Sequence, residues 1–273
     1  MKIKKIILGK GKVSSVITDK ESVVLDKKQC NILNINDLNN VINKYKPEII
    51  INCAAKTNLE YCQENKIDCF ESNTRGVLNL IEICSLKKIK LVHISSGCLF
   101  DGNEFIANEK THVSPKVWYT WTKAWADQII ENYGYENYLI LRPRQLISCK
   151  PHPTNMLTKF SKMKKIPAIK EPNSITCLED FKEIINHLIK IDAVGIYNCA
   201  NEGVVTPYDI AIGVKEKINP SLVVVKETYE NLLKQLPNRR VNTILSITKL
   251  KNSGYTPRSA KDALNWCLEN YGK

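Results

Sequence analysis

Tyr119 and Lys123 stand four residues apart in the segment Tyr-Thr-Trp-Thr-Lys. On a helix this spacing places both side chains on one face, so the lysine ammonium could lower the pKa of the phenol. Tyr119 could then exchange a proton near neutral pH. The hydroxyl of Ser96, in an earlier apolar segment, could hold a carbonyl oxygen of a substrate. The three residues indicate proton transfer to a carbonyl group, although a tyrosine and a lysine four apart are also common on ordinary helices.

A glycine-rich segment follows the first apolar run of the chain, and it reads Gly9-Lys10-Gly11-Lys12-Val13-Ser14. Glycines at these positions let backbone amides approach a pyrophosphate, which is also favoured by the N-terminal end of a following helix. Ser14 stands where a third glycine is usual and predicts slightly wider packing of helix on strand. By itself the motif is equally typical of an ordinary glycine-rich turn.

Charged residues after the second apolar run bear on the choice of dinucleotide. Asp26 could bind the ribose hydroxyls of NAD, whereas Lys27 and Lys28 could bind the extra phosphate of NADP. The sequence leaves this choice open.

The elements that must position these residues follow from hydrophobic periodicity. Short apolar runs predict buried strands at 3–8, 23–25, 48–52, 91–95 and 138–141, and helical spacing predicts helices at 69–87 and 122–133. Alternating strands and helices predict an α/β fold with a Rossmann-type, doubly wound parallel sheet. We expect a dinucleotide-binding domain over 1–146 and a smaller substrate-binding lobe over 147–273, with helices at 179–191 and 260–271. Residues 195–199 could return a strand to the sheet.

Composition fits a globular enzyme. The chain has 273 residues, of which 43% are hydrophobic and 25% charged. Its apolar runs are too short for a bilayer span, and its lysine-rich start lacks the apolar region of a signal peptide. We therefore expect a cytoplasmic protein without membrane contact.

Cysteine usage and charge exclude further classes. The 10 cysteines are scattered without a C-x-x-C pair, which predicts reduced thiols, and no His or Cys pair has metal-ligand spacing, which predicts no metal. The net charge of +12 comes from dispersed lysines. This pattern favours an anionic small ligand such as a nucleotide over nucleic acid.

Longer stretches resemble the extended short-chain dehydrogenase/reductases. The likeness is to the dTDP-4-dehydrorhamnose reductase group and to the bifunctional epimerase/reductases of plants and giant viruses. It covers nearly the whole chain and is carried by 46–58, 71–76, 93–102, 119–123, 172–176, 201–205, 239–242 and 248–250.

The resemblance implies roles for individual residues. Ser96, Tyr119 and Lys123 would be the catalytic trio, and Asn73 would support the lysine through a relay. The cofactor, NADPH with NADH as the alternative, would contact Tyr119 and Lys123 together with Gly9, Lys10, Gly11, Lys12, Val13, Asp26, Lys27, Asn52, Ala54, Ala55, Lys56 and Asn73. A nucleotide sugar would contact Ser96, Gly97, Asn155, Arg239, Arg240 and Asn242.

The chain has Gly97 and Cys98 directly after Ser96. At these two positions, relatives that act only as reductases tend to carry an acidic residue and an aromatic residue. The epimerase/reductases resemble this chain in having Gly-Cys, and they place a lysine in a segment like 155–160. A ketone at C4 of a sugar acidifies the C–H bonds at C3 and C5, so Cys98 would act as the base and Lys159 as the acid of an epimerisation.

We therefore expect a 3,5-epimerase/4-reductase that converts a nucleotide 4-keto-6-deoxyglucose to nucleotide-L-rhamnose. We favour the UDP-linked sugar, and the sequence leaves the dTDP-linked sugar open. A nucleotide-hexose 4,6-dehydratase would supply its substrate. One alternative is a 4-reductase without epimerase activity, acting on an N-acetylated 4-keto sugar. Another is a non-catalytic NADP-binding regulatory subunit, like that of methionine adenosyltransferase. The oligomeric state stays open, a homodimer included.

Overall fold

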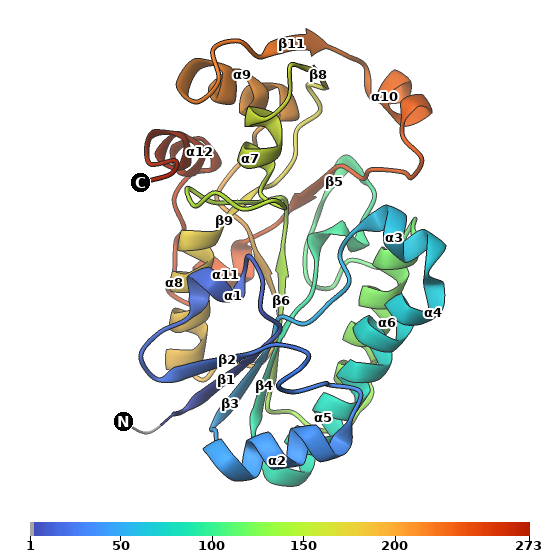
Figure 1. Cartoon of the computed structure of the whole chain (residues 1–273), viewed down its shortest axis with the longest axis vertical. Coiled ribbons are helices and arrows are strands. Elements are labelled where there is room, and N and C mark those ends of the chain that lie inside the picture. The colour runs from blue at the N-terminus through green and yellow to red at the C-terminus, as the bar shows by residue number, and fades with distance from the viewer. Residues whose placement is uncertain (1–2) are drawn as a thin grey trace. The chain divides into compact units, whose positions relative to one another are not determined.

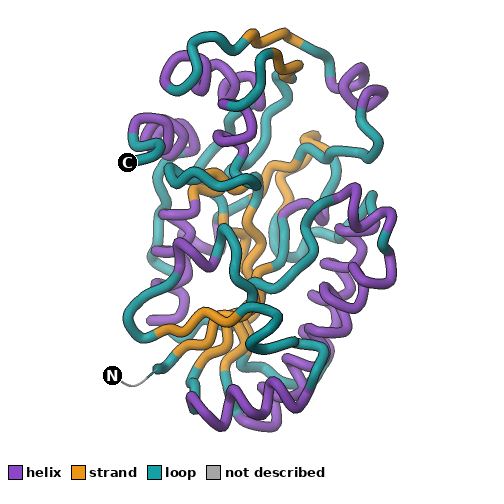
Figure 2. Tube along the Cα trace, in the orientation of Figure 1, coloured by secondary structure: helices purple, strands orange, loops and turns teal. Residues whose placement is uncertain are grey.

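The computed structural model describes residues 3–273, without the side chains of residues 103–105 (Figures 1 and 2). The chain forms two compact units of nearly equal size, whereas we expected the second to be smaller. The first unit comprises Met1–Leu99, Pro115–Arg142 and Ile189–Tyr197, and the second comprises Phe100–Ser114, Pro143–Leu188 and Asn198–Lys273. Residues 100–114, which precede our expected boundary, thus belong to the second unit.

The first unit is built on a six-stranded parallel sheet with the strand order β10-β6-β4-β3-β1-β2. The strands are β1 (Lys5–Leu8), β2 (Ser22–Leu25), β3 (Ile49–Asn52), β4 (Lys90–Ile94), β6 (Tyr138–Pro143) and β10 (Gly195–Cys199). The chain moves from β1 to β2 at one edge and then returns to the other side of β1. The order therefore reverses between β1 and β3, where ligands of such sheets bind at the carboxyl ends of the strands.

The helices of the first unit are α1 (Ser14–Ile17), α2 (Ile35–Tyr45), α3 (Leu59–Glu64), α4 (Lys66–Phe70), α5 (Gly76–Lys87) and α6 (Trp118–Asn132). Apolar side chains from α2, α5 and α6, such as Leu38, Leu80 and Ile130, pack with strand residues such as Ile6 and Ile50 in one core on one face of the sheet (Figure 1). The Rossmann-type doubly wound fold predicted from the strand–helix alternation is confirmed.

Two expected helices differ in ways that matter for the site. The helix expected over 69–87 consists of α4, a π-helical turn at Glu71–Arg75, and α5. The helix expected from 122 begins at Trp118, so Tyr119 and Lys123 both lie on α6. The helix α2 was not predicted. Its first turn is capped by Asn34, whose side chain accepts from the Asn36 backbone N–H at 2.9 Å.

The second unit contains short parallel strand pairs rather than a large sheet. Its strands are β5 (Gly102–Ala107), β7 (Leu146–Ile147), β8 (Lys165–Ala168), β9 (Thr176–Cys177), β11 (Val223–Lys226) and β12 (Thr243–Leu245). Its helices are α7 (Met156–Ser161), α8 (Leu178–Lys190), α9 (Pro207–Lys217), α10 (Tyr229–Gln235), α11 (Thr248–Asn252) and α12 (Ala260–Glu269). Within residues 3–273, we find no helix with the length and apolarity needed to span a bilayer.

Candidate active site

The structure gathers Ser96, Tyr119 and Lys123 in the first unit. Ser96 follows β4 and is buried, and its Oγ accepts a hydrogen bond from the Cys98 backbone N–H at 3.1 Å. The half-buried phenol of Tyr119 on α6 lies close enough to Ser96 for the serine to lower its pKa. Lys123 lies one turn further along the same helix. The hydroxyl of Ser96 thus follows the end of β4, and the phenol of Tyr119 and the amine of Lys123 come from the neighbouring helix α6.

Lys123 is almost fully buried, and two groups on β4 hold its amine. Nζ donates to the Ile94 carbonyl at 2.8 Å and lies 2.9 Å from His93 Nε2. On the other side of the imidazole ring, Asn52 Nδ2 lies 3.1 Å from His93 Nδ1, because the pairing of β3 with β4 places these two residues opposite each other. His93 was not among our site candidates. The available signal was a histidine inside an otherwise apolar strand.

Burial is the main influence on the protonation of Lys123 and His93. It lowers the pKa of Lys123 to about 8, and the nearby Asp127 carboxylate, which raises this pKa, has the smaller effect. Burial also lowers the pKa of His93 well below its usual value, and Lys123 adds to this effect, so the imidazole is neutral at pH 7.

The pKa of the Tyr119 phenol shifts in the opposite direction to the one that we expected. Burial, and next the neighbouring Cys98, raise the pKa of Tyr119 above its usual value, and the nearby Ser96 hydroxyl offsets this only in part. The expected net lowering of this pKa is therefore wrong, because loss of hydration dominates the shift. At pH 7 the Tyr119 phenol holds its proton and can donate it to an acceptor.

Asn73 is fully buried in the π-helical turn and joins this turn to two other segments. Its Oδ1 accepts from the Lys56 backbone N–H at 2.7 Å, and its Nδ2 donates to the Lys56 carbonyl at 2.9 Å and to Thr122 Oγ1 at 3.1 Å. Of the hydrogen bonds that Asn73 makes with described residues, none goes to Lys123. Asn73 thus positions the Lys56 backbone and Thr122, the α6 residue next to Lys123, and its relay to the lysine stays a prediction.

The glycine-rich segment forms a tight turn between β1 and α1. Gly9 has a φ of +96°, and a Cβ there would lie 2.6 Å from the backbone N and Cα of Ala54. Gly11 faces open space, and its N–H donates to Ser14 Oγ at 2.8 Å. The side chain of Ser14 is thus folded into the loop, and α1, with four residues, is shorter than the helix we expected to face a pyrophosphate.

In the turn after β2, the carboxylate of Asp26 is hydrogen-bonded within the turn, whereas the neighbouring lysine side chains face solvent. Asp26 Oδ1 accepts from the backbone N–H groups of Lys28 at 2.9 Å and Gln29 at 3.1 Å. The side chains of Lys27 and Lys28 are exposed. Lys56, expected to line the cofactor cleft, forms an ion pair with Asp68 at 2.9 Å.

The remaining candidates of the first unit follow β4 and β3. Gly97 is buried, and Cys98 is half-buried in the short 3-10 turn Gly97–Leu99. Ala54 and Ala55 are half-buried in the segment after β3, whereas Lys10 is exposed and Lys12 and Val13 are half-buried.

In the second unit, Asn155 and Lys159 lie at α7. Asn155 is fully buried and caps the helix, because its Oδ1 accepts from the Leu157 backbone N–H at 3.3 Å. Its Nδ2 donates to the carbonyls of Ser148 at 2.7 Å and Lys150 at 3.0 Å. Its amide is therefore used to position α7 rather than left for a ligand. Lys159 is exposed on the same helix.

The residues around 239–242 are held by partners within the second unit. Arg239 makes two charged contacts with Asp101, each of 2.8 Å. Asn242 Oδ1 accepts from Asn173 Nδ2 at 2.8 Å, and the Arg240 carbonyl accepts from the Tyr229 hydroxyl.

A doubly wound sheet with a serine after β4, and a tyrosine and a lysine one turn apart on α6, defines an extended short-chain dehydrogenase/reductase. Within this class, the family described as the RmlD substrate binding domain matches residues 8–273, and the chain belongs to it.

Individual relatives agree with this placement. The chain is 30% identical over 263 residues to an Arabidopsis thaliana bifunctional dTDP-4-dehydrorhamnose 3,5-epimerase/dTDP-4-dehydrorhamnose reductase, covering 92% of this chain and 81% of the relative. It is 27% identical to an Arabidopsis thaliana trifunctional UDP-glucose 4,6-dehydratase/UDP-4-keto-6-deoxy-D-glucose 3,5-epimerase/UDP-4-keto-L-rhamnose-reductase, covering 96% of this chain but only 41% of that protein. The crystal structure of dTDP-4-dehydrorhamnose reductase from Bacillus anthracis in complex with NADP superposes with a TM-score of 0.89 at 23% identity, covering 99% of each chain.

Proposed function

We propose that this protein is an NADPH-dependent 4-reductase of a nucleotide 4-keto-6-deoxyhexose. One observation carries the proposal: a protonated phenol, Tyr119, lies close enough to the Ser96 hydroxyl for the two groups to interact, within the fold of the family described as the RmlD substrate binding domain. Ser96 orients the ketone oxygen, and Tyr119 donates its proton to that oxygen as negative charge develops there. Lys123 lies on the same helix and, when charged, stabilises that charge.

The chain's own residues fit a dinucleotide. Gly9 lets the loop pack directly on the backbone of Ala54, and the open space beside Gly11 leaves room for a phosphate. When bound, NADPH supplies the hydride that reduces the ketone carbon. Because Asp26 is engaged in its own turn while Lys27 and Lys28 are exposed, the turn after β2 favours NADPH over NADH.

We further propose that the same protein epimerises C3 and C5 before reduction. The bifunctional relative carries both activities in its name. Cys98 lies two residues after Ser96 and close enough to the Tyr119 phenol to affect its pKa, so a thiolate there would be near a ketone held by these residues. Cys98 would remove a proton next to the ketone, and Lys159 would return one to the opposite face of the carbon.

For the substrate we propose the UDP-linked sugar, because the trifunctional relative acts on UDP-linked intermediates. The name of that relative also includes a UDP-glucose 4,6-dehydratase, and this chain spans 41% of that relative's length. For this protein too we propose that a nucleotide-hexose 4,6-dehydratase activity supplies the 4-keto substrate.

The reductase assignment is tested by the variant Tyr119→Phe. With UDP-4-keto-6-deoxyglucose and NADPH, the wild type should oxidise NADPH, and the variant should lose this activity while keeping the wild-type circular dichroism spectrum. Full activity in the variant would refute the role of the phenol.

The epimerase assignment is tested by running the reaction in heavy water and examining the sugar product by NMR. The wild type should place deuterium at C3 and C5, whereas a pure reductase would leave both carbons unlabelled. The variant Cys98→Ser should stop labelling, and Tyr119→Phe should keep labelling without reduction. Labelling that survives in Cys98→Ser would exclude Cys98 as the base.

A further inference from the structure

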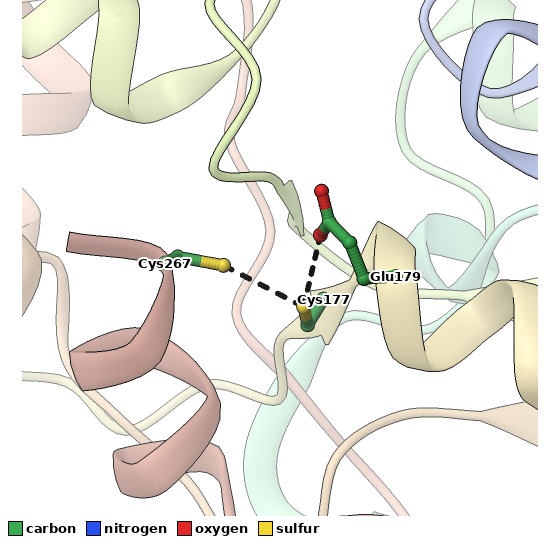
Figure 3. Close-up of side chains that lie close together, drawn as sticks. All are labelled: Cys177, Glu179 and Cys267. Atoms are coloured by element: carbon green, nitrogen blue, oxygen red, sulfur yellow. Dashed lines mark hydrogen bonds between the residues drawn. The ribbon is translucent and has the colours of Figure 1, made fainter. Parts of the chain in front are cut away.

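Two cysteines of the second unit, Cys177 and Cys267, lie close to each other and to the carboxylate of Glu179 (Figure 3). Cys177 Sγ lies 3.5 Å from Cys267 Sγ and 3.1 Å from Glu179 Oε2, and these three ligand atoms all lie within 4.8 Å of one another. Cys149 Sγ approaches the other carboxylate oxygen, Glu179 Oε1, at 3.2 Å. We propose that the second unit holds a site for Zn²⁺ made by Cys149, Cys177, Glu179 and Cys267.

The folded chain brings these residues together from four elements. Cys149 follows β7, and Cys177 ends β9, which pairs with β7. Glu179 lies in the first turn of α8, and Cys267 lies on α12. Because no two of these cysteines have the short spacing of a metal motif, the sequence led us to expect no metal.

The separations among Cys177, Glu179 and Cys267 are close to those of a tetrahedral zinc site. Cys149 Sγ lies outside this group, at the other carboxylate oxygen, and would move toward the ion to complete the site. Zinc–sulfur bonds of about 2.3 Å place two sulfur ligands about 3.8 Å apart, and a sulfur and an oxygen ligand about 3.6 Å apart. The Cys177–Cys267 and Cys177–Glu179 separations of 3.5 and 3.1 Å are shorter by only a few tenths of an ångström. Three thiolates and one carboxylate also form a donor set that Zn²⁺ accepts.

Zn²⁺ would have to displace protons from the thiols of this site. Burial raises the pKa of Cys149 to about 11, and the contact with Cys177 together with burial raises that of Cys267. Binding of Zn²⁺ would release three thiol protons to solvent and form three Zn–S bonds and one Zn–O bond. Glu179 is only half-buried and so offers a path for the ion.

Two neighbours would act on the bound site without binding the ion. Ser148 Oγ donates to Glu179 Oε1 at 2.6 Å and would orient the carboxylate. The Arg258 guanidinium lies 3.7 Å from Cys177 Sγ and would offset part of the negative charge of three thiolates and a carboxylate.

The site can be tested on the whole chain by titration with Co²⁺, which reports thiolate ligands by a charge-transfer absorption band. The protein is first reduced with a phosphine and freed of metal with a chelator. We expect one Co²⁺ per chain with a tetrahedral, thiolate-rich spectrum, and displacement by Zn²⁺. Cys177→Ser and Cys267→Ser should abolish the band, and Ser148→Ala should weaken binding by about tenfold to a hundredfold. Cys199→Ala, at a buried cysteine of the same unit outside the cluster, should leave the band unchanged.

A second measurement needs no variant. Zn²⁺ should protect Cys149, Cys177 and Cys267 of the wild type from alkylation, read by mass spectrometry, and should leave the labelling of Cys199 unchanged. Failure of the reduced wild type to bind Co²⁺, or a band that persists in both serine variants, would overturn the proposal. A Cys177–Cys267 disulfide formed on oxidation, without metal uptake by the reduced chain, would overturn it too and identify a redox pair.

Discussion

His93 Nε2 and Lys123 Nζ lie 2.9 Å apart, and the hydrogen bonds around them fix the position of the imidazole proton. The Ala54 backbone N–H donates to Asn52 Oδ1 at 3.0 Å, so the Asn52 amide nitrogen faces His93 Nδ1 as a donor at 3.1 Å. A neutral imidazole that accepts at Nδ1 carries its proton on Nε2. That proton points at Lys123 and favours the neutral amine over the ammonium, in agreement with the lowered pKa of Lys123.

The variant Asn52→Asp should raise the pKa of Lys123. A carboxylate at this position would accept from Nδ1–H of His93, which leaves Nε2 free to accept from a lysine ammonium. The other groups that act on Lys123, namely Asp127, Cys53 and Cys69, stay in place. NMR of isotopically labelled lysine, recorded as a function of pH, measures the pKa directly.

The control for this prediction is the same substitution in a His93→Leu background. That background has no imidazole whose tautomer could change, so only the smaller effect of the added carboxylate charge on the pKa of Lys123 should remain. An unchanged or lowered pKa of Lys123 in Asn52→Asp would contradict the proton arrangement described above.

Replacement of Lys123 by Met should stabilise the fold more at pH 7 than at pH 9. The folded-state pKa of about 8 lies below the usual 10.5, so the unfolded chain binds more protons between these values. The stability of the wild type relative to Lys123→Met should therefore rise by about 1 to 2 kcal/mol from pH 7 to pH 9. Urea denaturation of both proteins at both pH values measures this difference. A gap between them that stays constant with pH would argue against a depressed pKa.

Gly9→Ala and Gly11→Ala should separate stability from cofactor binding. At Gly9 a Cβ collides with the backbone of Ala54 and the φ of +96° is unfavourable, so we expect a loss of about 1 to 3 kcal/mol. At Gly11 a Cβ meets no atom within 4 Å, so stability should hardly change while NADPH affinity falls. Thermal unfolding and NADPH titration give the two readouts, and equal destabilisation by both variants would be the contrary result.

The double variant Lys27→Ala, Lys28→Ala should weaken NADPH binding by about tenfold, since each exposed ion pair contributes up to about 1 kcal/mol. NADH affinity should stay as in the wild type, because NADH lacks the phosphate. Titration with both dinucleotides makes the comparison. An equal loss for both would place the 2′-phosphate elsewhere.

Asp127→Asn should strongly destabilise the first unit. Asp127 Oδ2 lies 2.9 Å from Arg142 Nε, and both side chains are at most 3% exposed. Loss of the carboxylate breaks a buried ion pair and leaves the guanidinium charge uncompensated by Asp127, at a cost of about 3 to 5 kcal/mol. Glu202→Gln, in the exposed ion pair with Lys251, is the control and should cost less than about 1 kcal/mol. Similar denaturation midpoints for the two variants would disprove the difference.

The sequence by itself determined the features that follow from residues close together along the chain, namely the strands, a shared helix and a turn. Apolar runs located the central strands to within two residues at their starts and ends, because a strand buried on both faces needs continuous apolar side chains. The spacing of Tyr119 and Lys123 placed them on one helix, and the turn at Gly9 was visible as a glycine after a strand.

Only the tertiary structure decided what depends on burial and on contacts between distant segments. The contact of His93 with Lys123 needs α6 packed beside β4, and the gathering of Cys149, Cys177 and Cys267 needs β7 paired with β9 and α12 beside them. The raised pKa of Tyr119 follows from lost hydration, which no local pattern of residues records. Spacing along the chain fixes which side chains share an element, whereas desolvation and long-range contacts arise only when the elements pack.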